Sequence, residues 1–336
     1  IYKNRNALYD LVPPEGLVGR IGERNDLVME LSPILMNSPV NSIFVYGTPG
    51  TGKTATTTQI AQELRKEAAR MEIDLNSIYI NCSENRTEYA ILTEILSQLS
   101  TKTIPKLGWS TKKVLGELKK SLKESPSQVL VVLDEVDYLL KESGDNALYW
   151  LSRINTGEEA KLSSLVISND LRVYDYLSPR TQSSFGRIKI VFTPYSAPEL
   201  KAILANRSSK AFVPRTVSAA ALQKIADTEA QRGGDARKAL EILDSCAKLA
   251  LAQSKKSIGI NLVDEADRNL EQDQLIKTVT GLTRHQKVLY LTLLKQKSGC
   301  LGPDVYREYI KECKSFKVPS LSERRIRSFL ILFNEL

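Results

Sequence analysis

The sequence predicts an α/β fold, in which a parallel β-sheet covered by helices on both faces is followed by a region that is helical throughout. Five short and almost entirely apolar segments alternate with helical stretches, as is typical of strands buried in a parallel sheet. A Gly-rich stretch, GTPGTGKT, directly follows the first of these segments. From Ala197 onward the apolar residues recur only at helical spacing, which indicates helical domains after the sheet.

The predicted elements follow one another in regular order. Apolar segments predict strands over 42–46, 77–81, 128–133, 163–168 and 188–192. Helical spacing predicts helices over 22–37, 53–71, 87–99, a segment ending near 123, and 146–154. A basic connector with Pro and Gly is predicted over 101–113. Near the C-terminus, three amphipathic helices are predicted over 283–297, 303–313 and 320–333.

The composition excludes several classes of protein. The 336 residues are 42% hydrophobic and 26% charged, and no apolar run approaches the length of a membrane span, so no membrane partner is expected. With His285 as the only histidine, histidine-based catalysis and histidine-rich metal sites are disfavoured. The cysteines form no C-x-x-C pair, which argues against zinc and for reduced, intracellular thiols: Cys82, Cys246, Cys300 and Cys313.

The net charge of +8 is concentrated near the C-terminus. Residues 276–336 contain twelve Lys and Arg against five Asp and Glu, whereas the other 275 residues contain 35 against 34. Such asymmetry suggests a polyanion as the partner of the C-terminal segment, because basic side chains that neutralise phosphates release counterions. A solvated, Lys-rich surface is the alternative explanation for the charge alone.

The stretch GTPGTGKT matches the phosphate-binding pattern G-x-x-x-x-G-K-[ST] and lies between a predicted strand and a predicted helix. Its backbone N–H groups can surround phosphates, its lysine can reach the terminal phosphates, and its last hydroxyl can ligate Mg²⁺. This context makes an ordinary Gly-rich turn the weaker interpretation. The predicted nucleotide-binding residues of the loop are Gly47, Thr48, Pro49, Gly50, Thr51, Gly52, Lys53 and Thr54.

Polar residues follow two further strands of the predicted sheet. Asp134 and Glu135 come after the strand at 128–133, at the end where a doubly wound sheet binds its ligand. We expect Asp134 to hold Mg²⁺ through water, and Glu135 to orient the attacking water. Asn169 follows the next strand and can sense the terminal phosphate. Taken alone, acidic residues after a strand are often helix caps and such an Asn often forms a turn.

Two arginines are candidates for contacts with the phosphates. Arg237 lies in the first turn of a predicted helix in GGDARKAL, where its guanidinium could close a helical lid on the nucleotide. Arg180, in LSPRTQSSFGR, could act in trans on a neighbouring molecule as an arginine finger. Arg187 is a rival for that second role, since exposed arginines are common.

In chain order, the phosphate loop, VLVVLDEVD, LVISND, SPRTQSSFG, FTPYSAPEL and GGDARKAL together resemble the AAA+ ATPases of the origin-recognition and cell-division-control initiator family, in its archaeal form. The resemblance spans nearly the whole chain. It implies an AAA+ core over 1–195 with an initiator-specific insertion at about 83–113, a helical lid over 196–272 and a winged-helix DNA-binding domain over 273–336. It also implies that Val18 and Gly19, in LVPPEGLVGRIGER, contact adenine, and that the insertion, with Lys112 and Lys113, contacts DNA.

The last predicted helix has its own pattern. Ser320 and Glu323 have the spacing of a capping box. One apolar stripe is formed by Ile326, Phe329, Leu330 and Phe333. The remaining surface carries the candidate DNA-binding residues Arg324, Arg325, Arg327 and Ser328. A core helix with solvated arginines is the alternative, which the charge asymmetry and the resemblance disfavour. The family's β-hairpin wing has no counterpart in the sequence up to Leu336, so no wing contacts are assigned.

Together these features predict an ATP-dependent initiator that binds origin DNA and helps to recruit or load the replicative helicase. ATP and ADP with Mg²⁺ are the expected cofactors, and a slow ATPase is expected to serve as a switch. Double-stranded origin DNA, a paralogous initiator subunit and the helicase are the expected partners. The location would be cytoplasmic and nucleoid-associated in an archaeon and nuclear in a eukaryote. The alternatives are a clamp-loader-like AAA+ ATPase and a transcription regulator with a structural nucleotide.

Overall fold

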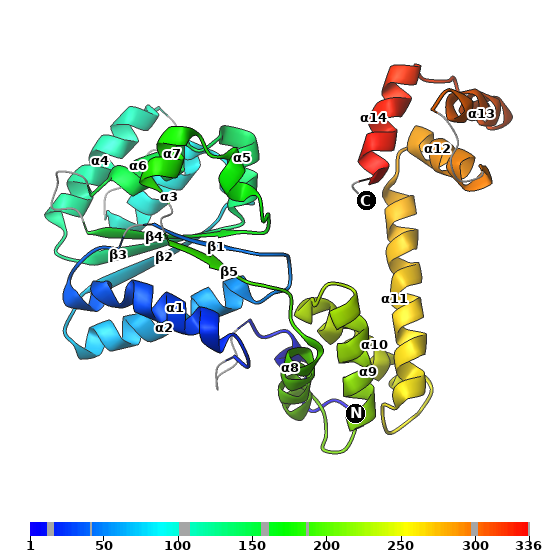
Figure 1. Cartoon of the computed structure of the whole chain (residues 1–336), viewed down its shortest axis with the longest axis horizontal. Helices are drawn as coiled ribbons and strands as arrows, with labels where there is room; N and C mark the ends of the chain where they lie inside the picture. Colours follow the sequence, from blue (N-terminus) through cyan, green and yellow to red (C-terminus); the bar gives the residue numbers. More distant parts are fainter. Residues whose placement is uncertain are drawn as a thin grey trace. The chain divides into compact units, whose positions relative to one another are not determined.

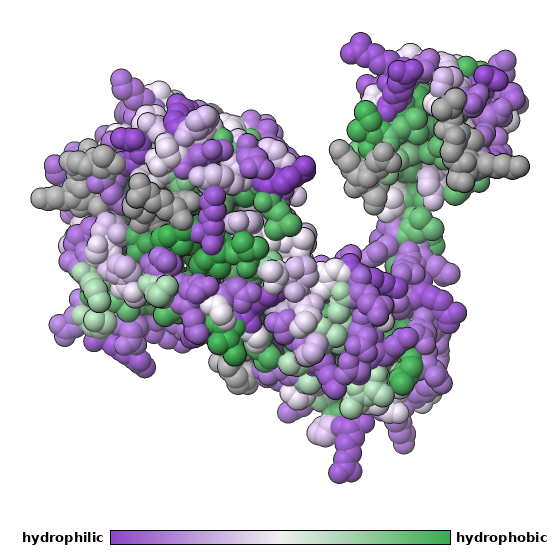
Figure 2. Space-filling model, viewed as in Figure 1, coloured by the Kyte–Doolittle hydropathy of each residue, from purple (hydrophilic) through white to green (hydrophobic). Residues whose placement is uncertain are grey.

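The computed structural model describes residues 1–11, 17–40, 42–100, 108–155, 161–185, 188–296 and 302–334. The chain forms two compact units, Ile1–Val263 and Asp264–Leu336. On the face shown in Figure 2, hydrophilic residues form most of the surface of each unit. Within the described residues, no helix is both long and apolar enough to cross a membrane.

The first unit contains a five-stranded sheet in the order β2-β3-β4-β1-β5, and every pair of neighbours is parallel (Figure 1). The strands are β1 (Ile43–Tyr46), β2 (Leu75–Asn81), β3 (Gln128–Asp134), β4 (Leu162–Ser168) and β5 (Ile188–Val191). Every residue of β3 and β4 is buried, which explains why these two strands lack polar alternation. Asn81 lies opposite Asp134, and Tyr46 opposite Ser168, so the carboxyl ends of four strands share one edge. The predicted parallel sheet is confirmed.

Helices cover both faces of this sheet. Alternate residues of each strand enter two separate cores: Val131 and Leu133 pack on one side of β3, and Leu130 and Val132 on the other. In Figure 1, α1 (Ile21–Leu31) and α2 (Lys53–Arg70) cover one face. The opposite face is covered by α3 (Glu88–Leu99), α4 (Thr111–Glu124), α5 (Val136–Ser143), α6 (Asn146–Arg153) and α7 (Pro179–Ser184).

Two local predictions for this unit are wrong, and one helix was not predicted. The helix predicted over 22–37 is α1 followed by a 3-10 helix, Ser32–Met36, because Pro33 has no N–H to continue the α-helical pattern. The helix α5 was not expected; with only Val136 and Leu139 buried, it is too short to show a periodic pattern. The connector predicted over 101–113 ends earlier, since Ser110 caps α4 by accepting a hydrogen bond from the Lys113 N–H. Residues 101–107 of that connector lie outside the described residues.

Three helices complete the first unit together with the start of a fourth: α8 (Ala197–Ala211), α9 (Ala219–Gln231), α10 (Ala236–Ala252) and the beginning of α11 (Ile260–Gly281). The N-terminal 3-10 helix η1 (Arg5–Leu8) packs on α8, and Leu8 is fully buried. Tyr2 stacks on Phe212 with ring centroids 5.1 Å apart. The first residues of the chain therefore pack with the helices predicted as the lid, not with the sheet.

The second unit contains the rest of α11 and three further helices, α12 (Arg284–Lys295), α13 (Gly302–Ser315) and α14 (Glu323–Asn334). Ile326 of α14 is buried against Leu289 and Tyr309, as the apolar stripe predicts. The predicted capping box is wrong, because α14 begins at Glu323 itself. The preceding residues stay extended, since Leu321 donates its N–H to the Tyr309 hydroxyl and accepts a hydrogen bond from Tyr306.

Candidate active site

The Gly-rich loop at 47–54 connects β1 to α2. Gly50 and Gly52 have φ angles of 73° and 86°, in the left-handed region that favours glycine. A Cβ atom at Gly52 would lie 2.3 Å from the hydroxyl oxygen of Tyr195, so the packing here requires bare backbone. Because α2 begins at Lys53, the first N–H groups of the helix lack partners within the helix and are available to an anion.

The side chains of the loop also fit a phosphate. Lys53 is only 4% exposed, and its Nζ donates to the carbonyl oxygens of Gly47 and Thr48, each at 2.8 Å. Burial lowers the pKa of Lys53 to about 8, and Asp134 acts in the opposite direction. A bound phosphate would favour the charged ammonium further. The buried Thr48 Oγ1 has no hydrogen-bond partner among the described residues, so this loop holds an unused donor as well as a cation.

Asp134 is held by three hydrogen bonds at the end of β3. Its Oδ2 accepts from the Thr54 hydroxyl at 2.8 Å and from the Tyr79 hydroxyl at 2.7 Å, and its Oδ1 accepts from the Glu135 N–H at 2.8 Å. Since Thr54 gives its proton to Asp134, the lone pairs of its oxygen remain for a cation. The described residues contain no cluster of three or more metal-ligating side chains. The oxygens of Thr54 and Asp134 are of the kind that Mg²⁺ prefers, so these two residues would fit this ion.

Glu135 and Asn169 follow neighbouring strands and both line the same cavity. Glu135 has a φ of 54°, an uncommon angle for a residue with a side chain, and it forms the turn between β3 and α5. Asn169 follows the last residue of β4, and its N–H donates to Asp137 at 2.9 Å. The structure thus brings together the two side chains that the sequence predicts to act on water and the terminal phosphate.

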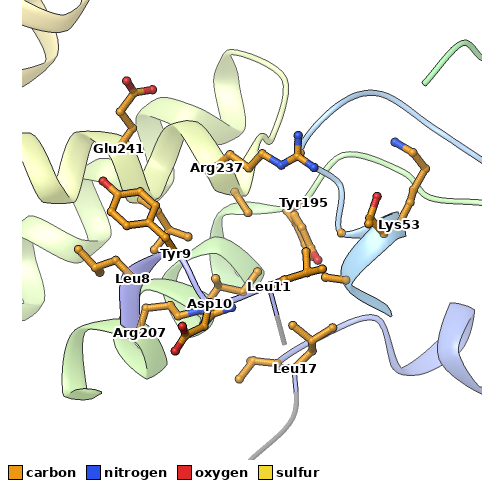
Figure 3. A pocket seen from close by; sticks show the side chains of 18 of the residues that line it. Leu8, Tyr9, Asp10, Leu11, Leu17, Lys53, Tyr195, Arg207, Arg237 and Glu241 are labelled. Carbon is orange, nitrogen blue, oxygen red and sulfur yellow. The ribbon is translucent and has the colours of Figure 1, made fainter. Parts of the chain in front are cut away.

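Arg237 reaches the cavity from α10. Asp235 caps this helix by accepting hydrogen bonds from the N–H groups of Arg237 and Lys238, at 2.8 and 3.3 Å. The Ala236 N–H donates to the Gly50 carbonyl at 3.2 Å, so the start of α10 touches the phosphate loop directly. Figure 3 shows the Arg237 side chain extending toward the side of the pocket where Lys53 lies.

The cavity has a volume of about 420 Å³, within the range of roughly 300–1,000 Å³ that ligand sites occupy. Eight predicted residues line it: Val18, Gly50, Gly52, Lys53, Thr54, Glu135, Asn169 and Arg237. The other predicted residues are not part of its lining: Gly19, Gly47, Thr48, Pro49, Thr51 and Asp134. Gly47 instead packs closely against the residue after β5, since a Cβ there would lie 2.2 Å from the Phe192 carbonyl oxygen.

Tyr195 lies in the stretch FTPYSAPEL, but no sequence pattern predicts a role for it. Its ring lines the cavity and is 6% exposed. The Arg20 guanidinium stacks on this ring at 3.8 Å from the centroid and donates to the Thr51 carbonyl at 3.0 Å and to the Thr193 carbonyl. Arg20 therefore joins the phosphate loop to the segment that leads into α8. No sequence pattern links Arg20 and Tyr195 to the loop; the folded structure alone brings them together.

The N-terminal segment supplies the opposite end of the cavity, with Leu8, Tyr9 and Leu11 in its lining (Figure 3). Hydrogen bonds to Asp244, whose side chain is 1% exposed, hold this segment against α10. Arg5 donates to both Asp244 oxygens at 2.8 and 2.7 Å.

The Tyr2 hydroxyl also donates to Asp244, at 2.7 Å, and Lys248 lies 2.8 Å away. Although burial favours the neutral acid, hydrogen bonds from Arg5, Lys248 and Tyr2 hold the pKa of Asp244 below its usual range. We call Asp244 with Arg5, Tyr2 and Lys248 the N-terminal clamp. No motif indicates it from the sequence.

Arg180 does not line the cavity of its own chain. Its guanidinium donates to the Asn146 side chain and lies 4.9 Å from the centroid of the Tyr149 ring. Ser178, at the start of α7, is tied to Asp145 through both its N–H and its hydroxyl. These contacts hold Arg180 on the surface of the unit, the position that action in trans would require. Its rival Arg187 lies outside the described residues.

The predicted DNA-binding residues are exposed on two helices. On α14, Arg327 pairs with Glu323 at 2.7 Å, and the Ser328 hydroxyl donates to the Arg324 carbonyl at 3.0 Å. The Arg325 guanidinium lies 5.8 Å from the Phe329 ring centroid. In the first unit, Lys112 and Lys113 lie in the first turn of α4, where the Lys113 Nζ is 4.3 Å from the centroid of the Trp109 ring.

Comparisons with known proteins agree with this architecture. Residues 37–173 match an AAA domain, and residues 201–268 match the Cdc6 AAA+ ATPase-type lid domain. The "ORC1-type DNA replication protein" of Pyrococcus furiosus is 36% identical over 344 residues, covering 100% of this chain and 81% of that protein. "ORC1-type DNA replication protein 1" of Archaeoglobus fulgidus is also 36% identical, covering 98% of this chain and 81% of that protein.

Among solved structures, the Aeropyrum pernix ORC1 protein in complex with DNA is similar with a TM-score of 0.83 and 28% identity, covering 100% of this chain and 88% of that one. The sequence relatives and the similar structure therefore indicate the same family as the order of motifs in the chain. The chain belongs to the archaeal-type origin-recognition and cell-division-control family of AAA+ ATPases, which are initiators of DNA replication.

Proposed function

We propose that this initiator binds ATP with Mg²⁺, hydrolyses it slowly to ADP, and uses the difference between the two states as a switch while it is bound to double-stranded origin DNA. The observation that carries the proposal is the cavity lined jointly by the phosphate loop, Glu135, Asn169 and Arg237. In this proposal, the groups around the cavity bind phosphate, orient water and connect the nucleotide to the lid. They come from the loop, from two strand ends and from α10. A structural nucleotide would need only the first of these.

In this proposal each side chain has a defined task. The N–H groups of the loop and Lys53 bind the phosphates, and Val18 and Gly19 contact the adenine. Thr54 and Asp134 would hold Mg²⁺, and the bound ion would supply positive charge to neutralise the phosphate oxygens. Glu135 orients the attacking water and Asn169 bonds to that water or to the terminal phosphate. Arg237 donates charge-assisted hydrogen bonds from the lid.

The switch is tested with Glu135→Ala. We expect the variant to keep ATP bound without hydrolysing it, because the side chain acts on the water and not on the phosphates. Nucleotide recovered from the purified protein, together with single-turnover hydrolysis, measures this. Binding to duplex DNA should persist in the same preparation. Undiminished hydrolysis would remove Glu135 from the mechanism.

We propose that α14 and the start of α4 contact the DNA. The support is the excess of basic residues in the C-terminal segment, the exposed arginines of α14, and the DNA that the related Aeropyrum pernix protein binds in its solved complex. Minor-groove contacts of a wing are not assigned to any residue. In the same proposal, the AAA+ core lies within residues 1–195, with η1 at its start packed on the lid helix α8, while the lid spans 196–272 and the DNA-binding domain 273–336.

The DNA contact is tested with Arg324→Ala combined with Arg325→Ala. Duplex affinity should fall, and the slope of log affinity on log salt should shrink by about one for each phosphate that the variant no longer neutralises. ATP affinity should stay as in the wild type. The matched control is Lys255→Ala combined with Lys256→Ala, an exposed basic pair in the turn after α10. An equal decrease in the control would mean that charge alone, and not α14, determines binding.

A paralogous subunit and the replicative helicase are the proposed protein partners. Arg180 supports the first of these, since it lies on the surface away from its own cavity and is available to the phosphate of a neighbouring molecule. Arg180→Ala should then lower hydrolysis only in a mixture of the two subunits. A decrease of the same size in the isolated chain would contradict action in trans.

A further inference from the structure

Asp137 connects the two strand ends that carry Glu135 and Asn169. It lies in the first turn of α5, two residues after Glu135. Its Oδ1 accepts a hydrogen bond from the Ser168 hydroxyl at 2.5 Å, and its Oδ2 accepts from the Asn169 N–H at 2.9 Å. Both oxygens of this carboxylate are thus used on the end of the neighbouring strand β4.

The hydroxyl of Ser168 is oriented by a further contact. Ser168 is fully buried, and its Oγ accepts a hydrogen bond from the Asp170 N–H at 2.9 Å. The Asp170 carbonyl is a second acceptor for the hydroxyl proton, but it lies 3.2 Å from the Oγ, whereas the Asp137 oxygen lies at 2.5 Å. Asn169 therefore lies between two residues whose polar groups are already paired, which limits the positions that its side chain can reach.

The sheet does not make this connection by itself. The ladder between β3 and β4 runs from the pair Val129 and Leu162 to the pair Leu133 and Val166. Glu135 and Asn169 both come after the last of these pairs. On its other side, β4 is held by β1 as far as Ser168. In the described residues, Asp137 is the side chain that joins the turn after β3 to the end of β4 by hydrogen bonds.

We propose that Asp137 is a positioning residue for ATP hydrolysis, which fixes Asn169 relative to Glu135 so that both side chains reach the same water and terminal phosphate. The inference rests on the proposed roles of those two residues. Asp137 itself does not line the cavity. A carboxylate suits this position because it can accept from both partners at once, a hydroxyl and an amide N–H; an asparagine can accept from only one of them and would turn its NH₂ group toward the other.

The test is single-turnover hydrolysis of bound ATP by Asp137→Asn in the full chain. We expect the rate constant to fall about 10- to 100-fold, the decrease that small displacements of catalytic groups produce. ATP and ADP affinities should remain those of the wild type when both proteins are assayed well below their thermal midpoints. A rate that falls only together with nucleotide affinity would mean a merely structural role and would overturn the inference.

Ser168→Ala provides a second, independent variant that removes one of the two hydrogen bonds and leaves the carboxylate. If the two side chains act as a unit, the double variant Asp137→Ala with Ser168→Ala should be no less active than Asp137→Ala alone. Decreases that multiply would contradict a shared role.

The matched control is Asp74→Asn. Asp74 also accepts a hydrogen bond from a serine hydroxyl, that of Ser127, but at the opposite end of strands β2 and β3. It should leave hydrolysis unchanged. Glu135→Ala in the same assay distinguishes the proposed role of Glu135 from that of Asp137. If Glu135→Ala hydrolyses normally, the proposed role of Glu135 fails; if it is inactive and Asp137→Asn is not impaired, only the role of Asp137 fails.

Discussion

The two ends of the cavity are built in different ways. At the phosphate end, eight consecutive residues form the loop, and the side chains that complete it follow the strands β3 and β4 directly. At the lid end, the lining comes from the N-terminal segment, α8 and α10, with residues such as Leu8, Ile203 and Leu240. The first end depends on backbone geometry at particular residue types. The second depends on tertiary packing of ordinary apolar side chains.

Each end is nevertheless organised by a buried carboxylate. Asp134 accepts two hydroxyl donors and one backbone N–H, and one of the hydroxyls belongs to Thr54, its expected partner in holding the metal. Asp244 accepts from a guanidinium, a phenol and an ammonium, and so fastens a chain segment to α10. A buried carboxylate is therefore expected to help hold the metal at one end, and it holds two chain segments together at the other. We expect substitutions at the phosphate end to lower hydrolysis, and substitutions at the lid end to weaken nucleotide binding while hydrolysis of bound nucleotide continues.

The largest effect is expected at the phosphate end. Lys53→Ala removes the buried ammonium of the loop and should lower the hydrolysis rate about 100-fold or more, as removal of one preorganised donor does in other enzymes. Nucleotide affinity should fall in parallel, measured by titration with a fluorescent ADP analogue. Lys66→Ala, on the exposed side of the same helix, is the matched control. Retained hydrolysis in Lys53→Ala would contradict the assignment of this end.

Next in size is the effect of releasing the N-terminal clamp with Asp244→Ala. Removing hydrogen bonds to charged groups should lower the free energy of unfolding by about 1.5–3 kcal/mol. Nucleotide affinity should weaken because Leu8 and Tyr9 lose their fixed position, while hydrolysis of nucleotide that does bind should continue at the wild-type rate. The control is Asp227→Ala on α9, where the carboxylate accepts a hydrogen bond from the Gln223 side chain one helical turn away. If hydrolysis of bound ATP also fails, the two ends are not separable.

The clamp should also depend on pH. The pKa of Asp244 in the folded protein lies below its ordinary value of 3.8. Its ionised form therefore contributes stability that is fully present above that ordinary value and is lost as the pH falls toward the lower folded-state pKa. Thermal midpoints of the wild type and of Asp244→Ala should differ at pH 7 and converge in acid below about pH 4. A difference that grows on acidification would show that the clamp does not use the carboxylate.

The same contrast explains how much the sequence could predict. The strand VLVVL and the loop GTPGTGKT are local patterns, and from them the sheet, the loop and the positions of Asp134 and Glu135 followed. The clamp joins Arg5 to Asp244 across 239 residues, and nothing near either residue signals the other. Tyr195 and Asp137 lie within recognisable motifs, yet their roles depend on contacts with Arg20 and Ser168 that only the fold creates. Short elements such as α5 lack the length for a periodic signal.

The smallest effect is expected from Tyr79, a residue of the phosphate end that no motif includes. Tyr79 is 46% exposed, and its hydroxyl shares the Asp134 Oδ2 with the Thr54 hydroxyl. Tyr79→Phe removes one hydrogen bond and keeps the ring, so the free energy of Mg²⁺ binding should become less favourable by about 0.5–1.5 kcal/mol. Because Asp134 is expected to hold Mg²⁺, this should appear as a higher Mg²⁺ concentration for half-maximal tightening of nucleotide binding. Affinity measured in EDTA should not change.

The control for this variant is Tyr176→Phe, an exposed tyrosine in the 3-10 helix Val173–Tyr176 after β4. It is expected to leave the Mg²⁺ dependence as in the wild type. If Tyr79→Phe weakens binding equally with and without Mg²⁺, its hydroxyl supports the loop as a whole and not the metal-facing carboxylate. At the phosphate end, as at the lid end, a hydrogen bond from a residue distant in sequence would then stabilise the fold. The two ends would differ only in how much they depend on such contacts.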